Sequence, residues 1–207
     1  QSSYHCVGIK VLENAIKIPK LTPIEARLHR VIKGEVKSIT VTRSATGKYY
    51  ASILCDDGLE APAKPTLIST VTGLDMGLEH YAIMSDGEKV PNPRHLINAS
   101  RNLRHKQKAL SRKQKGSSNR KKARIRLAAL HERVANARAD FQHKLSRVIV
   151  DENQAVIVET LKTANMMKNH NLARAIGDAG WHSFIIKLEY KTAEKGVHLV
   201  KLDQWFA

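Results

Sequence analysis

The sequence is poor in cysteine and has no long hydrophobic run. Its two cysteines, Cys6 and Cys55, have 48 residues between them, so no CxxC pair is present and the usual zinc-ligand pattern is absent from this chain. A single disulfide and two buried free thiols are the alternatives for them. No apolar run reaches the ~18 residues that a membrane-spanning helix needs. We therefore expect no membrane-spanning segment, and the N-terminal residues show no signal-peptide pattern.

Acidic residues are missing from one long stretch. The formal net charge is +16, and residues 89–131 contain 14 Lys and Arg but no Asp or Glu. A field this strong and local favours a polyanion, which is usually nucleic acid. A solvated basic face and a membrane-surface patch are the alternatives, although the stretch lacks the Trp and Phe of interfacial helices. The predicted nucleic-acid-binding residues are Arg101, Arg104, Lys106, Lys108, Arg112, Lys113, Lys115, Arg120, Lys121, Lys122 and Arg124.

Short strands dominate the first part of the chain. Alternating apolar residues predict strands at 7–12 and 15–19, and a hairpin at 36–42 and 49–54 turns at Gly47, which can adopt a positive φ. Several short strands in one run favour a small β-barrel-like domain. Residues 56–65 resemble a linker, with Pro62 and Pro65 restricting it. We therefore predict a first domain over residues 1–65.

Residues 66–207 show a different pattern and form the second predicted domain. Apolar segments predict strands at 71–77, 81–85, 89–90, 155–158 and 197–202, and helices at 95–115, 120–151 and 171–195. The second helix carries an apolar stripe at Leu127, Leu130, Val134, Ala137, Phe141, Leu145 and Val148, with Arg126, Arg133, Arg138, Lys144 and Arg147 opposite. This order of elements predicts an α/β domain with a mixed sheet.

Two carboxylates stand at unusual places in the predicted strands. Asp75 lies within an apolar strand between glycines, and Glu159 ends the buried strand at 155–158. Asp is disfavoured inside strands unless something compensates its charge, and a bound cation would do so. An ion pair for Asp75 and a plain surface position for Glu159 are the alternatives. Taken together, the two acids favour a site for Mg²⁺ or Mn²⁺, which prefer hard oxygen ligands.

Several motifs resemble one known family. Gly73-Leu-Asp-Met-Gly-Leu78 is similar to the first catalytic motif of RuvC-like nucleases, and Val156-Ile-Val-Glu-Thr-Leu161 followed by Asn165-Met-Met-Lys168 resembles the second motif of TnpB. Ile176-Gly-Asp-Ala-Gly-Trp181 resembles the same family, which is the transposon-encoded relative of type V CRISPR nucleases. The resemblance runs over nearly the whole chain.

The resemblance to TnpB implies an RNase H-like (RuvC) fold with a basic helical insertion, preceded by a wedge segment. It implies an RNA-guided DNA endonuclease that hydrolyses phosphodiesters with two metal ions, with Asp75 and Glu159 in the first two catalytic positions. The implied partners are a guide RNA made from the transposon end and double-stranded target DNA. The implied location is the cytoplasm of a prokaryotic cell, at the nucleoid.

The sequence departs from the TnpB pattern near its end. In that family a zinc ribbon and a third catalytic Asp follow the last strand, and neither is within these 207 residues. We therefore expect the chain to be part of a longer protein, with zinc only in the missing ribbon. Asp203 is a weak stand-in for the third acid. A nuclease-inactive RNA-guided DNA-binding protein and a general nucleic-acid-binding module are the alternative functions.

Five other side chains have two possible roles each. Trp181 and Phe184 are expected in the core rather than as platforms for stacked bases. Asp178 is expected to start a helix rather than to bind a metal. Tyr49 and Tyr50 either pack within their strand or stack on RNA.

Overall fold

The structure is a computed structural model that describes residues 2–4 and 8–203. The chain divides into two compact units, Gln1–Glu60 and Ala61–Ala207. Cys6 lies outside the described residues, and Cys55 is a half-buried free thiol. None of the described helices is both long and apolar enough to cross a membrane.

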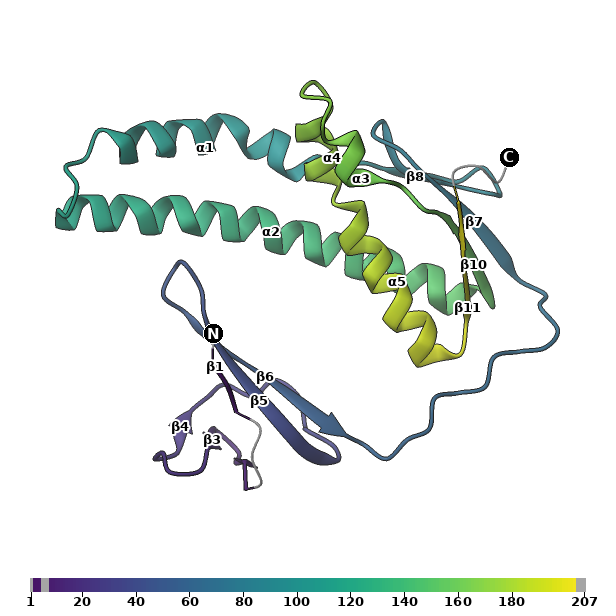
Figure 1. Cartoon of the computed structure of the whole chain (residues 1–207), viewed down its shortest axis with the longest axis horizontal. Helices are drawn as coiled ribbons and strands as arrows, with labels where there is room; N and C mark the ends of the chain where they lie inside the picture. Colours follow the sequence, from purple (N-terminus) through teal and green to yellow (C-terminus); the bar gives the residue numbers. More distant parts are fainter. Residues whose placement is uncertain (1, 5–7, 204–207) are drawn as a thin grey trace. The chain divides into compact units, whose positions relative to one another are not determined.

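The first unit contains two small antiparallel sheets (Figure 1). One pairs β1 (Ser2–Tyr4), β5 (Glu35–Arg43) and β6 (Tyr49–Asp56), and the other pairs β2 (Lys10–Val11), β3 (Ala15–Lys17) and β4 (Ile24–Glu25). The predicted hairpin is confirmed, with Gly47 at φ 90° in its turn. Ile9, Ile16, Ile18 and Ile39 form the core. Within the described residues these strands form two separate sheets, where a small barrel was expected.

The second unit is built on a five-stranded mixed sheet with the strand order β11-β10-β7-β8-β9. β7 (Val71–Met76), β8 (His80–Met84) and β9 (Lys89–Pro91) are antiparallel neighbours. β10 (Ala155–Glu159) runs parallel to β7, and β11 (His198–Leu202) runs parallel to β10. Parallel neighbours need long crossover connections, which the helices provide. The predicted α/β class with a mixed sheet is confirmed.

The described residues of this unit also form five helices: α1 (His95–Ser111), α2 (Ser118–Glu152), α3 (Thr163–Met166), α4 (Ala173–Ala179) and α5 (Trp181–Lys195). The prediction of one helix over 171–195 was wrong, because Gly180 separates α4 from α5. Gly180 has φ 64°, and a Cβ there would lie 3.1 Å from Cδ of Arg138. A positive φ and this close approach both favour glycine, so the chain turns sharply at that point.

The main core lies between one face of the sheet and helices α2 and α5. Phe184 and Leu188 of α5 are fully buried, and Tyr81 of β8 makes edge-to-face contacts with Phe184 and Phe141. Trp181 is also buried, which confirms the core assignment of Trp181 and Phe184. On the opposite face of the sheet, Val71 and Val200 remain 50% and 43% exposed.

A buried polar network joins α2 to α5 and was not predicted. The amide of Gln142, which is 1% exposed, donates to the hydroxyl of Tyr81 and to the carbonyls of Ala179 and Gly180, while its oxygen accepts from Lys187. Burial raises the pKa of the Tyr81 hydroxyl above its ordinary value. The predicted stripe on α2 needs one correction. Val148 is 49% exposed, because the stripe shifts near the sheet to the buried Ile149 and Val150.

Truncation of Phe184 should destabilise this unit strongly. Phe184→Ala is expected to lower the free energy of unfolding by about 3–5 kcal/mol, because it removes a fully buried ring and leaves a cavity. Ile186→Ala is the matched control, since Ile186 lies on the same helix and is 45% exposed. Denaturant unfolding followed by tryptophan fluorescence measures both changes. Equal losses for the two variants would contradict the placement of the core.

Candidate active site and nucleic-acid interface

Asp75 and Glu159 lie on adjacent parallel strands. Leu74 of β7 is in register with Val158 of β10, so Asp75 and Glu159 are the next residues along the two strands. Neighbouring strands lie about 4.8 Å apart. Leu74 and Val158 both point into the core, and side chains alternate along a strand. The two carboxylates therefore project from the opposite face, side by side at the carboxyl edge of the sheet.

The two acids line one open pocket of about 480 Å³. The pocket also includes Gly73, Ser85 and Asp203. Asp75 is exposed and Glu159 is half-buried. Among the described residues, neither carboxylate has a Lys, Arg or His within ion-pair distance. The ion-pair alternative for Asp75 therefore finds no support in this structure, and both carboxylates are available to a ligand in the pocket.

Asp203 lines the same pocket without completing a ligand set. It follows Leu202, which is the partner of Glu159 in the β10–β11 register. Strand alternation would turn the residue after Leu202 toward the other face. In the described parts of the chain, no group of three or more His, Cys, Asp and Glu side chains is arranged to hold a metal ion. Asp75 and Glu159 thus form a pair of candidate ligands.

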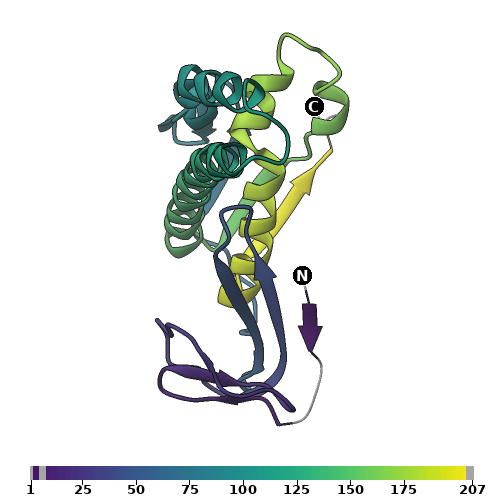
Figure 2. The ribbon, with the colours of Figure 1, turned by 90° about the vertical axis from the view of Figure 1, so that its left-hand side faces the viewer.

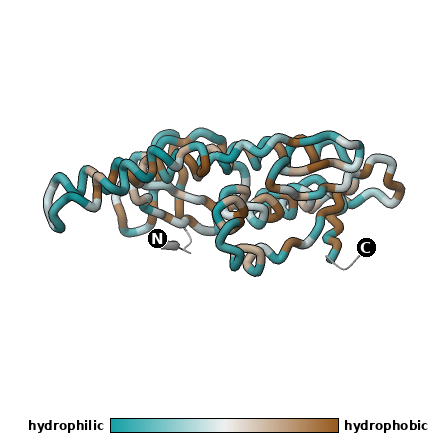
Figure 3. The backbone as a smooth tube through the Cα atoms, turned by 90° about the horizontal axis from the view of Figure 1, so that it is seen from above, coloured by the Kyte–Doolittle hydropathy of each residue, from teal (hydrophilic) through white to brown (hydrophobic). Residues whose placement is uncertain are grey.

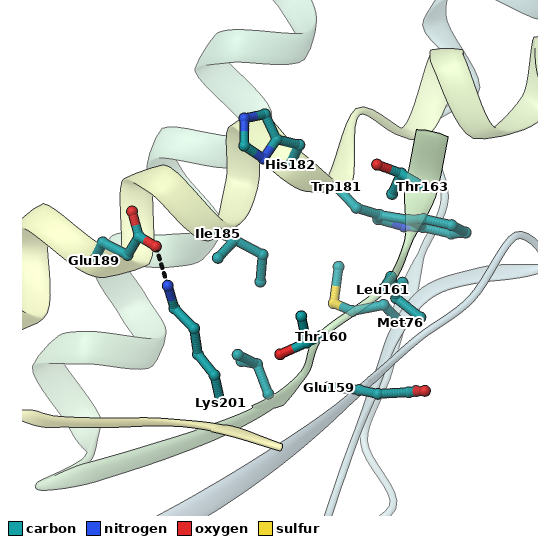
Figure 4. Close-up of a pocket in the computed structure, with 11 residues that line it drawn as sticks. Met76, Glu159, Thr160, Leu161, Thr163, Trp181, His182, Ile185, Glu189 and Lys201 are labelled. Carbon is teal, nitrogen blue, oxygen red and sulfur yellow. Dashed lines mark hydrogen bonds and ion pairs between the residues drawn. The ribbon is translucent and has the colours of Figure 1, made fainter. Parts of the chain in front are cut away.

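A second, smaller pocket of about 180 Å³ lies behind Glu159 (Figure 4). It is mainly apolar, with Met76, Leu161 and Ile185 in its walls, and Lys201 forms an ion pair with Glu189 at one side. In Figure 4 the Glu159 side chain extends away from Ile185 and Lys201. Glu159 therefore lines both pockets.

The predicted basic residues gather on the hairpin formed by α1 and α2. The two helices lie side by side in Figures 1 and 2. The hydropathy colours of Figure 3 show that the outer half of the hairpin is mainly hydrophilic. Arg101, Arg104, Lys108 and Arg112 recur every three or four residues, so they share one exposed face of α1. That face lies opposite the half-buried Leu103 and Leu110. Of the other predicted binding residues, Lys113, Lys115, Lys121, Lys122 and Arg124 are exposed, and Lys106 is half-buried.

Arg120 differs from the other cations of the hairpin. Its guanidinium donates to the carbonyls of Leu110 and Lys113, at 3.2 and 3.0 Å. The side chain of Ser117 caps α2 by accepting from the backbone N–H of Arg120. These bonds close the loop between α1 and α2, so Arg120 has a structural role there in addition to its charge.

Comparisons with known proteins identify the family of the chain. A family described as "Probable transposase", OrfB_IS605, matches residues 52–170. The chain belongs to this TnpB-type transposase family.

Two curated relatives extend that match over most of the chain. A Streptomyces pristinaespiralis protein named "Putative RNA-guided DNA endonuclease" is 42% identical over 89% of this chain and 46% of its own length. The Escherichia coli K12 protein InsQ, which bears the same description, is 32% identical over 91% of this chain and 50% of its own length. The chain thus spans about half the length of these TnpB-type relatives.

The chain is also similar to solved structures. One of them is a complex of Cas12f1 with sgRNA and target DNA, determined by cryo-electron microscopy, and it aligns with a TM-score of 0.45 and 14% identity. The alignment covers 80% of this chain and 41% of that one.

Sequence reasoning missed the role of Asp178 in this TnpB-type chain. Asp178 was expected to start a helix, but it lies near the end of α4 and is 4% exposed. Its carboxylate accepts from the backbone N–H groups of Leu96 and Ile97 at 2.8 and 3.0 Å, and it faces Arg138 at 3.4 Å. Arg138 was expected on the face of α2 opposite the apolar stripe, and it is partly buried in this ion pair. The sequence offers no local signal for a contact between residues 82 apart.

Proposed function

We propose that the chain contains the main part of the nuclease domain of an RNA-guided, metal-dependent DNA endonuclease. The observation that carries this proposal is the side-by-side placement of Asp75 and Glu159 at a pocket on the sheet. Their strands, β7 and β10, are central in a mixed sheet whose order fits an RNase H-like (RuvC) fold. The basic hairpin of α1 and α2 is then the helical insertion between those two strands.

The donor set fits a divalent metal. Asp75 and Glu159 supply hard carboxylate oxygens, which suit Mg²⁺ or Mn²⁺. Within the described residues no protein cation neutralises either acid, and the pocket is open to a phosphodiester. When bound in pairs, such ions activate a water and stabilise the leaving oxygen of the phosphodiester. The role of this chain is to hold the two carboxylates at fixed positions on neighbouring strands.

The partners follow from charge and from the family. The proposed partners are a guide RNA derived from the transposon end and double-stranded target DNA. Both are polyanions, which a chain of net charge +16 would attract. We assign residues 1–65 to the wedge domain and residues 66–207 to the RuvC-like domain, close to the division between the two compact units. The proposed place of action is the prokaryotic cytoplasm.

Cleavage by the complete protein tests this proposal. The protein is loaded with a transposon-end RNA and mixed with a plasmid that carries the matching target. Linear plasmid is expected with Mg²⁺ and the matching guide, but not with EDTA or an unrelated guide. Guide-dependent binding without cutting under all metal conditions would favour the nuclease-inactive alternative. Binding that does not depend on the guide would favour a general nucleic-acid-binding module.

A further inference from the structure

Helix α1 lacks the local features that usually stabilise a helix start. Arg94, at its N-cap position, has φ 48° and makes no side-chain capping bond, and no acidic residue occupies the first turn. None of the helix's own residues is fully buried. The first backbone N–H groups of a helix need acceptors from outside the helix. For α1, two of these acceptors come from another part of the chain.

Asp178 supplies those acceptors from α4. One carboxylate oxygen accepts from Leu96 N–H and the other from Ile97 N–H, and the side chain is only 2% exposed. A carboxylate is stabilised at a helix N-terminus, where the partial charge of the helix is positive. Arg138 of α2 offsets the burial of the charge from the other side. One buried carboxylate therefore joins α1, α2 and α4.

This junction lies at the start of the helix that carries exposed cations of the basic hairpin. Arg101, Arg104, Lys108 and Arg112 all follow the capped turn on the same helix. The 17 residues of α1 span about 25 Å. A tilt of about 10° at the capped end would therefore move the far end of α1 by about 4 Å. The cap thus acts together with the packing of α1 against α2 to fix where the cations of α1 lie relative to the sheet.

We propose that Asp178 is a positioning residue for nucleic-acid binding. It anchors the start of α1 and so sets the direction in which the exposed cations of this helix meet a phosphate backbone. This inference rests on the proposed nucleic-acid interface of the hairpin. It concerns α1 alone and does not depend on cleavage at Asp75 and Glu159.

The test measures binding of a 20-base-pair RNA–DNA hybrid to the complete protein. Asp178→Ala is expected to weaken binding by about five- to tenfold, which corresponds to the typical worth of a helix cap. Asp178→Asn keeps one oxygen acceptor and is expected to give a smaller loss. Asp140→Asn is the matched control, because it makes the same change of charge on an exposed acid that pairs with Lys144. Amide exchange at Leu96 and Ile97 should accelerate in the Asp178 variants only.

A double-mutant cycle separates positioning from general loss of structure. Arg104→Gln should weaken binding in the natural background and should have a smaller effect when combined with Asp178→Asn. Additive effects, or unchanged binding by a folded Asp178→Asn protein, would overturn the inference. If Arg104→Gln and its neighbours on the same face did not alter binding at all, the proposed interface itself would be wrong. If Asp178→Ala does not fold, Asp178→Asn and its amide exchange decide the question.

Discussion

Asp75→Asn and Glu159→Gln are each expected to reduce target cleavage by about a thousandfold or more, because each removes a negative ligand from a shared metal site. Both replacements keep the size of the side chain and its place at the edge of the sheet. Binding of guide RNA and target should remain close to that of the natural protein, since neither residue lies on the basic hairpin. Single-turnover cleavage and a gel-shift titration on the same protein measure the two properties.

Asp86→Asn is the matched control for these variants. Asp86 carries the same charge in the same unit, but it lies in the turn after β8 and accepts from the N–H of Glu88. Its replacement should leave cleavage unchanged. Asp203→Asn is also expected to retain cutting. Asp203 follows the end of β11, where strand alternation would turn its side chain away from the face that carries Asp75 and Glu159. Full cutting by both Asp75→Asn and Glu159→Gln would refute the catalytic assignment.

Neutralising the exposed face of α1 should have the largest effect on affinity. With Arg101, Arg104, Lys108 and Arg112 all changed to Gln, binding of duplex DNA at 0.1 M salt is expected to fall by about 10²- to 10³-fold. The slope of log affinity against log salt should decrease in magnitude by about 3.6, since each of the four lost phosphate contacts removes about 0.9. Titrations at several salt concentrations measure both quantities.

A second quadruple variant controls for net charge. Lys144, Arg147, Lys195 and Lys201 also lie in the second unit, but each forms an ion pair with an acid. Changing these four to Gln alters the net charge by the same amount. The salt slope should then change little. Equal losses for the two sets would mean that the overall field of the protein, rather than the α1 face, binds the nucleic acid.

The strands and the candidate site could be predicted because their signals are local. β7 and β10 were evident as apolar segments, and Asp75 and Glu159 stood out as carboxylates at places where apolar residues are usual. The side-by-side placement of the two acids depends on strand order. That order follows from the parallel pairing of β7 with β10, which residues far apart in the chain create.

The features that sequence reasoning missed depend on tertiary contacts. Gly180 ends α4 with a positive φ, at a place where a Cβ would lie 3.1 Å from Cδ of Arg138 and 3.3 Å from Nε2 of Gln142, and a helical pattern continues on both of its sides. Gln142 is a polar residue that the core accepts because each of its amide groups finds partners. Asp178 caps a helix that begins 83 residues earlier in the chain. Periodicity carries no information about partners of this kind.

Direct measurement of Mn²⁺ binding tests the central claim most directly, because it observes the metal site without requiring cleavage. Mn²⁺ is titrated into the complete protein bound to guide and target, and the free ion is followed by electron paramagnetic resonance. We predict that Asp75→Asn and Glu159→Gln each weaken Mn²⁺ binding by about tenfold or more, because each removes one ligand of the same site. Asp86→Asn should bind Mn²⁺ like the natural protein. Unchanged Mn²⁺ binding in both carboxylate variants would contradict the account.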